Sequence, residues 1–280
     1  MKYTCPTDIA ILLAAYNAEK YLDEQLKSLL TQTNSDWTLY IRNDGSTDKT
    51  QAIIEMYVAS YPDRIIQIDK GAGNLGCNAN FFRLLDAVEA DYYMFCDADD
   101  VWFPEKVSVS YNHIRNEENA HPDMPILAFS DCTVCDAELN VLEKSYWKSA
   151  GINPYRFLSF NYLAISGIVG GARTVFNRKV KDLAIPFHEK FMYDHWISLQ
   201  TAKSGLLSVI DTPLLYYRQH GNNVCGVAVG EAASLSAKIK NLPHMLREYY
   251  SNAQLFSRIG YGSFIKYFYY KLLVALRNRF

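Results

Sequence analysis

The sequence predicts an α/β protein with a mostly parallel, doubly wound sheet flanked by helices and followed by a C-terminal helical extension. Within about the first 95 residues, apolar runs of strand length alternate four times with apolar residues at helical spacing. The loops between them are short, as in repeated strand–helix units. Polar residues follow the predicted strands, at the edge where parallel sheets bind ligands. With 280 residues, 49% of them hydrophobic, the chain can bury a full core.

The first half of the chain supplies the alternating elements. Strands are predicted in four apolar runs, at 9–15, 37–41, 64–68 and 92–96. Helices are predicted at 21–30, through Ile53 to Tyr57, at 78–88 and near 105–118. The second half is less regular, because two prolines, Pro122 and Pro125, interrupt the alternation. Strands are expected there at 126–130 and 206–210, an extended segment at 213–219, and a helix that ends near Lys203.

The C-terminal segment differs in charge from the rest of the chain. Residues 238–280 contain eight Lys or Arg and one acid, a net charge of +7. The remaining 20 basic and 29 acidic residues give −9, and the whole chain carries −2. One apolar helix face is expected from Phe264, Phe268, Leu272, Ala275 and Leu276, with Lys266, Tyr270 and Arg277 opposite. Cations beside aromatic residues favour an anionic membrane surface over nucleic acid as the partner. The alternative is a helix that packs on the body and leaves its charges in solvent.

Several features favour a cytoplasmic protein. The first residues lack the apolar core of a signal peptide, and no run of 18 apolar residues is present. The six cysteines are scattered, several of them in predicted strands, which fits reduced thiols. Cys132 and Cys135 form a single CxxC pair, and we interpret both as strand residues. The expected location is the cytoplasm, with the protein peripheral on the inner face of the plasma membrane through its C-terminal helix.

A cluster of acids follows the apolar strand at 92–96. Asp97, Asp99 and Asp100 repel one another, and burying an unpaired carboxylate costs several kcal/mol, roughly. A divalent cation would neutralise them, because Mg²⁺ and Mn²⁺ take oxygen ligands and share them with phosphates. The alternative is a solvated acidic turn before a helix with Pro104 at its first position. The sequence therefore predicts a Mg²⁺ or Mn²⁺ site here.

Other polar residues follow neighbouring strands of the predicted sheet. Tyr16, Asp44 and Asn74 stand at carboxyl ends, as Asp97 does, so we expect the four to converge on one edge. Asp194 stands at the start of the helix that ends near Lys203. It is a candidate general base, and the alternative for it is a helix N-cap. His188 and His195 are more simply explained as structural residues.

The order of these motifs resembles a family 2 glycosyltransferase. The resemblance covers roughly residues 7–225 and rests on six stretches: Ala14-Ala15-Tyr16-Asn17, Asn43-Asp44-Gly45-Ser46-Thr47-Asp48, Asn74-Leu75-Gly76, Asp97-Ala98-Asp99-Asp100-Val101-Trp102, Asp194-His195-Trp196 and Tyr217-Arg218-Gln219-His220. It implies the GT-A fold, a nucleotide-diphosphate sugar as donor, and inversion at the anomeric carbon. The closing stretch resembles the branch that acts on bacterial surface polysaccharide and often transfers rhamnose.

The resemblance implies a role for each of these positions. The nucleotide would be bound by Ala14, Tyr16, Asp44, Asn74, Gly76, Asp97, Ala98 and Arg218. Asp44 would accept the N3–H of uracil or thymine, and Arg218 would neutralise the diphosphate. Asp99 and His220 would bind the metal, and Asp194 would be the general base. The expected substrates are dTDP-rhamnose or a UDP-hexose and a hydroxyl of a saccharide or lipid-linked acceptor, with no nucleic acid involved.

The resemblance also implies the domain boundaries. We expect a transferase domain at 1–225, with a donor half at about 1–120 and an acceptor half at about 121–225, and a basic, aromatic extension at 226–280. This chain departs from the family's usual His-Asp-Trp-Trp pattern, because it reads Tyr193-Asp194-His195-Trp196. A catalytically silent nucleotide-sugar-binding protein is the alternative, and the presence of Asp194 weighs against it. A nucleotidyltransferase is disfavoured because residues 14–20 contain no glycine for a phosphate loop.

Overall fold

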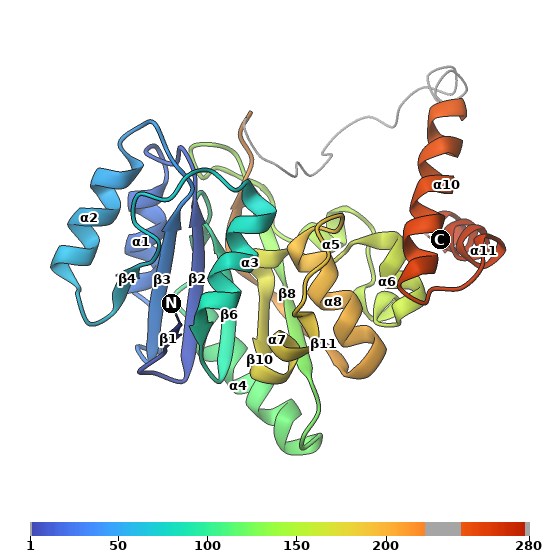
Figure 1. Cartoon of the computed structure of the whole chain (residues 1–280), viewed down its shortest axis with the longest axis horizontal. Helices are drawn as coiled ribbons and strands as arrows, with labels where there is room; N and C mark the ends of the chain where they lie inside the picture. Colours follow the sequence, from blue (N-terminus) through green and yellow to red (C-terminus); the bar gives the residue numbers. More distant parts are fainter. Residues whose placement is uncertain (1, 222–241, 278–280) are drawn as a thin grey trace.

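The computed structural model describes residues 2–221 and 242–277. Its main sheet has nine strands in the order β4-β3-β2-β6-β10-β8-β11-β7, with β9 paired to β8 (Figure 1). The strands are β2 (Ile9–Ala15), β3 (Trp37–Asn43), β4 (Ile65–Gln67), β6 (Tyr92–Asp97), β7 (Val101–Trp102), β8 (Ile126–Cys135), β9 (Val141–Glu143), β10 (Thr174–Asn177) and β11 (Leu206–Arg218). Two short strands, β1 (Tyr3–Thr4) and β5 (Val88–Glu89), pair separately.

One half of the sheet is parallel, as the sequence predicts. Strands β4, β3, β2 and β6 run side by side in the same direction, so their carboxyl ends meet at one edge. Ala14 pairs in register with both Arg42 and Asp97, which places the ends of β2, β3 and β6 together. Every residue of β2 and β3 except Ala14 is buried, because helices cover both faces. The α/β expectation is confirmed for this half.

The other half of the sheet is mixed. Strand β10 is antiparallel to both β6 and β8, so β8 again runs in the direction of β6. Strand β11 is parallel to β8 along its length and ends at Arg218, at the same edge as the first four strands. Two expected segments, 206–210 and 213–219, are thus one strand with irregular register. Cys132 and Cys135 are buried in β8 with free thiols, which agrees with their interpretation as strand residues.

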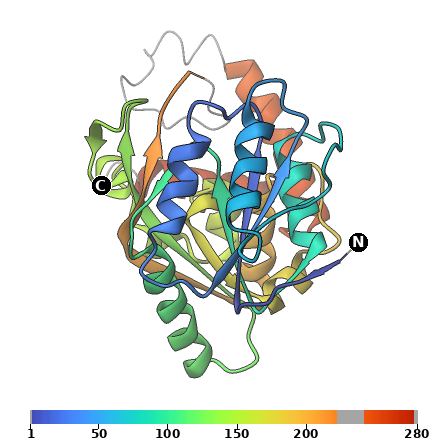
Figure 2. The ribbon, with the colours of Figure 1, turned by 90° about the vertical axis from the view of Figure 1, so that its left-hand side faces the viewer.

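Helices cover the two faces of the sheet (Figure 2). On one face lie α1 (Leu22–Leu30), α2 (Thr50–Ser60) and α4 (Lys106–Ala120), and on the other lie α3 (Cys77–Ala87), α7 (Arg178–Ala184) and α8 (Tyr193–Ser204). Alternate residues of β2 point to opposite cores: Ile11 joins the first group, whereas Leu12 joins the second. Short helical segments fill 146–173, namely α5 (Tyr146–Ser149), η1 (Pro154–Phe157), α6 (Phe160–Ser166) and η2 (Gly171–Arg173).

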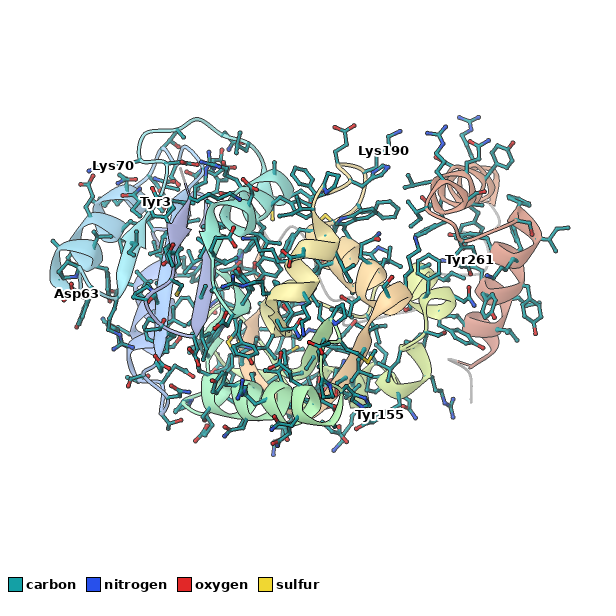
Figure 3. The ribbon with its side chains drawn as sticks, turned by 60° about the horizontal axis from the view of Figure 1, so that its bottom comes forward. Tyr3, Asp63, Lys70, Tyr155, Lys190 and Tyr261 are labelled. Carbon is teal, nitrogen blue, oxygen red and sulfur yellow. The ribbon has the colours of Figure 1, made fainter. Side chains whose placement is uncertain are left out.

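At the end of the molecule opposite α2, the C-terminal helix α11 (Phe264–Arg277) packs against α6, and α10 (Leu242–Arg258) packs against α11 (Figure 1). Tyr267 is only 2% exposed and stacks on Phe256 at a centroid distance of 5.9 Å. Tyr261 lies between these helices and the body, and its hydroxyl donates to the Asn161 carbonyl at 3.0 Å (Figure 3). At least one side of α11 is therefore part of the fold. Residues 222–241, which include the predicted boundary at 225, lie outside the described residues.

Candidate active site

The loops after β2, β3 and β4 are joined at the carboxyl edge by hydrogen bonds. The Asn17 N–H donates to Ser46 Oγ at 3.0 Å, and the Thr47 N–H donates to Asn17 Oδ1 at 2.9 Å. Asn17 itself has a φ of 46°, a left-handed conformation that asparagine tolerates better than most residues. Beside this junction Tyr16 is 54% exposed, so its ring is accessible to a ligand.

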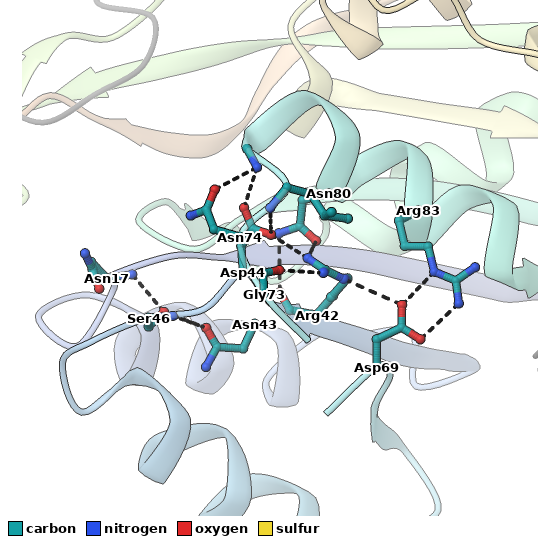
Figure 4. Close-up of polar contacts among 12 residues, drawn as sticks. Asn17, Arg42, Asn43, Asp44, Ser46, Asp69, Gly73, Asn74, Asn80 and Arg83 are labelled. Carbon is teal, nitrogen blue, oxygen red and sulfur yellow. Dashed lines mark hydrogen bonds and ion pairs between the residues drawn. The ribbon is translucent and has the colours of Figure 1, made fainter. Parts of the chain in front are cut away.

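Asp44 shapes the neighbouring loop (Figure 4). Its buried carboxylate accepts from Arg42 Nη1 at 2.5 Å and from the backbone N–H groups of Leu75 and Gly76, both at 2.8 Å. These three bonds leave Oδ2 with one acceptor position, because a carboxylate has about four in all. Asp44 thus holds the Asn74-Leu75-Gly76 loop in place and retains capacity for one further donor, such as an imide N–H. Its contact with a base stays a prediction.

The loop that Asp44 holds offers backbone to a ligand. Asn74 Oδ1 accepts from the Gly76 N–H at 3.0 Å, and Asn74 and Gly76 themselves are not buried. Gly76 has a φ of +83°, and nothing lies within 4 Å of the position where a Cβ would be. Gly45, with a φ of +75°, brings its own backbone close to Asn74, where a Cβ would lie 3.2 Å from the Asn74 nitrogen. The predicted nucleotide side of the site is therefore open.

The acidic cluster of Asp97, Asp99 and Asp100 is present, and two of its carboxyl groups have raised pKa values. Burial and the charges of Asp99 and Asp194 raise the pKa of Asp97 to about 8. Burial and the charges of Asp99 and Asp97 likewise raise the pKa of Asp100, whose Oδ2 has no hydrogen-bond partner among the described residues. Ala98 is buried between them. Tyr193, the neighbour of Asp194, packs its ring against Phe95 of β6, the strand that ends in Asp97, so the predicted base lies near this end of the strand although Asp97 and Asp194 are 97 positions apart.

Asp99 and His220 come together as the sequence predicts. His220 Nε2 lies 2.9 Å from Asp99 Oδ2, and its ring stacks on Tyr21 at a centroid distance of 4.8 Å. In the described parts of the chain no group of three or more His, Cys, Asp or Glu side chains could hold a metal ion. Mg²⁺ and Mn²⁺ are usually bound by one or two protein ligands plus substrate phosphates, so the Asp99–His220 pair fits a cation completed by a diphosphate.

Arg218 connects the end of β11 to the loop that carries Asp99 and Asp100, a structural role that the sequence did not predict. Its buried guanidinium donates from Nε to the Asp99 carbonyl at 2.8 Å and from Nη1 to the Ala137 carbonyl at 2.5 Å. Nη2 forms an ion pair with Glu24, and the Arg218 backbone N–H lies 3.3 Å from Asp100 Oδ1. Arg218 therefore ties the end of β11 to the acidic loop. A direct contact with the diphosphate stays a prediction.

Asp194 lies in the first turn of α8, one residue after its first residue, so it is not the N-cap, which is Met192. Its Oδ1 accepts from the His195 N–H at 2.7 Å and its Oδ2 from the Gly171 N–H at 3.0 Å. Burial raises the pKa of Asp194 above the usual value, against the effect of these two hydrogen bonds. A raised pKa makes a carboxylate a stronger base. His195 Nε2 lies 3.1 Å from the Leu163 carbonyl, in agreement with its structural interpretation.

A comparison with known protein families decides what this arrangement is. The profile described as glycosyl transferase family 2 matches residues 10–179, more than half of the chain. The chain belongs to glycosyl transferase family 2. It is 28% identical to a dTDP-rhamnosyl transferase, RfbG of Shigella flexneri, over 85% of this chain and 80% of that protein.

Solved structures confirm the GT-A fold of this family 2 glycosyltransferase. The S. aureus TarS 1–349 complex with UDP-GlcNAc is similar at a TM-score of 0.55 and 17% identity, covering 81% of this chain and 62% of that one. A mannosyltransferase from Pyrobaculum calidifontis, solved with GDP-Man and Mn²⁺, has a TM-score of 0.57 and 12% identity, covering 88% and 64%. The chain thus spans less than two thirds of the length of these two solved chains.

Two residues beside the glycosyltransferase site were missed by the sequence analysis. Lys106 is buried with its ammonium 4.6 Å from the Trp102 ring, and burial lowers its pKa to about 8. The positive charge of Lys106 lowers the pKa of Asp100 and so counteracts part of the increase caused by burial. Tyr193 precedes Asp194 and is also buried. In the sequence, Lys106 and Tyr193 are marked only by their position near a motif. Their burial and orientation could not be predicted, because these depend on packing between elements that are distant in the chain.

Proposed function

We propose that this glycosyltransferase is an inverting enzyme that moves a sugar from a nucleotide diphosphate to a hydroxyl of a saccharide or lipid-linked acceptor. The observation that carries the proposal is the position of Asp194: its neighbour Tyr193 packs against Phe95 of β6, the strand that ends in Asp97. A base on one side and a diphosphate site on the other are the two requirements of a single displacement. No covalent intermediate is then needed.

Different residues of the chain bind the nucleoside, the metal ion and the acceptor proton. Asp44, Tyr16, Ala14 and the backbone at Gly76 bind the nucleoside, and Asp97 holds the ribose or assists the metal. A Mg²⁺ or Mn²⁺ ion bound by Asp99 and His220 would neutralise charge on the leaving diphosphate. Asp194 accepts the proton of the acceptor hydroxyl as that oxygen bonds to the anomeric carbon. The bond to the nucleotide diphosphate breaks, and its oxygen keeps the electron pair.

The donor class is inferred from the relatives. The name of RfbG specifies dTDP-rhamnose, and the TarS structure contains UDP-GlcNAc. Both bases carry the N3–H that Asp44 can accept. We therefore propose dTDP-rhamnose or a UDP-hexose as donor and bacterial cell-surface polysaccharide as the product. The alternative, a catalytically silent binding protein, has no use for a base with a raised pKa at Asp194.

A thermal-shift screen tests this function. We expect one of dTDP-rhamnose, UDP-glucose or UDP-GlcNAc, with Mn²⁺, to raise the melting temperature more than GDP-mannose does. Ligand at 100 times its dissociation constant stabilises the fold by about 2.7 kcal/mol. Release of the nucleotide diphosphate from the best donor, with a saccharide or lipid-linked acceptor, then measures turnover. Stabilisation without turnover for any acceptor would favour the silent binding protein.

We also propose that α10 and α11 contact the cytoplasmic face of an anionic membrane. Five large side chains on these helices are exposed and form an apolar patch that we call the outer patch: Tyr250, Phe264, Ile265, Tyr269 and Leu272. Tyr250 and Phe264 lie in contact, with ring centroids 5.5 Å apart. The net charge of +7 over residues 238–280 suits anionic headgroups. No helix in the described residues is long and apolar enough to span a bilayer.

The outer patch predicts a specific loss of membrane binding. Ile265→Asp with Leu272→Asp should lower the fraction that sediments with phosphatidylserine vesicles by about tenfold or more, since burying each side chain is worth about 1.5–3 kcal/mol. Met56→Asp, a similarly exposed position on α2, is the matched control. Removal of α11 is a poorer test, because it takes away the buried Tyr267 and would destabilise the body. Equal sedimentation of both variants and the wild type would contradict the proposal.

A further inference from the structure

Tyr193 is held rigidly beside the predicted base. It is the first residue of α8 and only 4% exposed. Its ring stacks on Phe81 of α3 at a centroid distance of 4.0 Å and meets the edge of Phe95 of β6 at 4.9 Å. Helices α3 and α8 lie on the same face of the sheet (Figure 1). Because both phenylalanines are buried, the direction of the Tyr193 hydroxyl is determined by packing.

The hydroxyl points to the backbone that holds Asp194. A Cβ placed on Gly171 would lie 2.0 Å from the Tyr193 hydroxyl oxygen, so only glycine leaves room for it. The N–H of the same Gly171 donates to Asp194 Oδ2 at 3.0 Å. The phenol and the base therefore contact the same residue. Burial, followed by the charges of Asp97 and Asp194, raises the pKa of Tyr193, so the hydroxyl stays protonated.

This hydroxyl has no hydrogen-bond partner among the residues that the structure describes. Tyr93, another buried tyrosine, shows the usual arrangement: its hydroxyl donates to the Val88 carbonyl at 3.2 Å and accepts from the Ala90 N–H at 2.8 Å. Unlike the Tyr40 hydroxyl, the Tyr193 hydroxyl is not among the fully buried atoms without a partner, so it can be reached by a ligand. A reachable donor beside the predicted base, with no bond inside the protein, is available to bind a substrate oxygen.

We propose that the Tyr193 hydroxyl binds the transferred sugar beside Asp194, and thereby selects the donor. The inference rests on the proposed function: the sugar must lie between the leaving diphosphate and the base. The neutral phenol donates a hydrogen bond to an oxygen of the sugar and transfers no proton. The contacts of Tyr193 are with Phe81, Phe95 and Gly171, none of which is assigned to the nucleotide, so we expect Tyr193 to act on nucleotide sugars more than on the free nucleotide.

Tyr193→Phe tests this directly, because it removes the hydroxyl and keeps the ring against Phe81 and Phe95. Calorimetry with Mn²⁺ would measure the dissociation constants of UDP, UDP-GlcNAc, dTDP and dTDP-rhamnose. We expect the two diphosphates to bind within twofold of wild type. The preferred nucleotide sugar should bind about tenfold more weakly, the effect of one lost hydrogen bond, and kcat/KM should fall at least as much. Tyr40→Phe is the control, since the Tyr40 hydroxyl also has no hydrogen-bond partner but is fully buried, in the middle of β3.

Two results would overturn the inference while leaving the proposed function intact. One is a Tyr193→Phe variant whose nucleotide-sugar affinity and turnover remain within twofold of wild type. The other is an equal loss of affinity for diphosphates and nucleotide sugars, which would assign the hydroxyl to the nucleotide site or to the fold. A wild-type protein that binds none of the four ligands would overturn the proposed function, and the inference with it.

Discussion

Asp194→Asn is expected to lower turnover by about 10² to 10⁴ while donor binding is retained, the usual span for loss of a general base. The amide keeps the shape of the carboxylate, and its single oxygen can still accept from one of the two N–H groups, that of His195 or that of Gly171. One hydrogen bond is lost, at a cost of about 1–3 kcal/mol, so a thermal melt checks that the variant is folded before its loss of kcat is measured. Initial rates of nucleotide diphosphate release, with the donor found in the thermal-shift screen, measure the effect.

The pH profile gives a second measure of the same residue. Burial raises the pKa of Asp194. In a plot of kcat against pH, the wild type should therefore lose activity at a pH above the pKa of an ordinary aspartate. Activity is present above the pKa of Asp194 and is lost as the pH falls through it. Asp182→Asn, an exposed position on α7, should leave both rate and profile unchanged. Turnover of Asp194→Asn within about threefold of wild type would assign the base to another residue.

Asp99→Ala is expected to abolish metal-dependent nucleotide binding and leave the fold intact. Asp99 is one of two groups placed to bind the cation, and its contact with His220 is partly exposed. Removing it also lowers the repulsion that raises the pKa of Asp97, so the apo protein should be at least as stable as wild type. Calorimetry with UDP or dTDP, with and without Mn²⁺, measures the binding.

The control separates the metal site from general charge effects. Asp211→Ala removes one acid from an exposed position on β11 and should leave Mn²⁺-dependent affinity unchanged. Metal-dependent affinity that persists undiminished in Asp99→Ala would show that the cation has other ligands. Thermal melts without ligand check that both variants fold.

The local pattern of residues was enough to predict the parallel half of the sheet. The runs that became β2, β3 and β6 are apolar throughout because both faces of a covered sheet are buried, and such runs are recognisable without knowledge of their neighbours. Because Asp97 and Asp99 directly follow the apolar run of β6, the sequence also predicted that they lie at the edge of the sheet where the parallel strands end. Resemblance to a family assigned both Asp99 and His220 to the metal, but only the structure showed that these side chains, 121 positions apart in the chain, contact each other.

What the sequence by itself determined is therefore the α/β alternation, the acidic edge and the family. Only the tertiary structure decided which groups meet there. In the folded chain β10 lies antiparallel to β6, and Arg218 binds the acidic loop through the Asp99 carbonyl. Tyr193 packs against Gly171 beside Asp194. The tertiary structure also placed Tyr267 inward and Leu272 outward on α11. The physical reason is that strand and helix periodicity is a property of neighbouring residues, whereas the burial, partners and pKa of a side chain depend on segments brought together by folding.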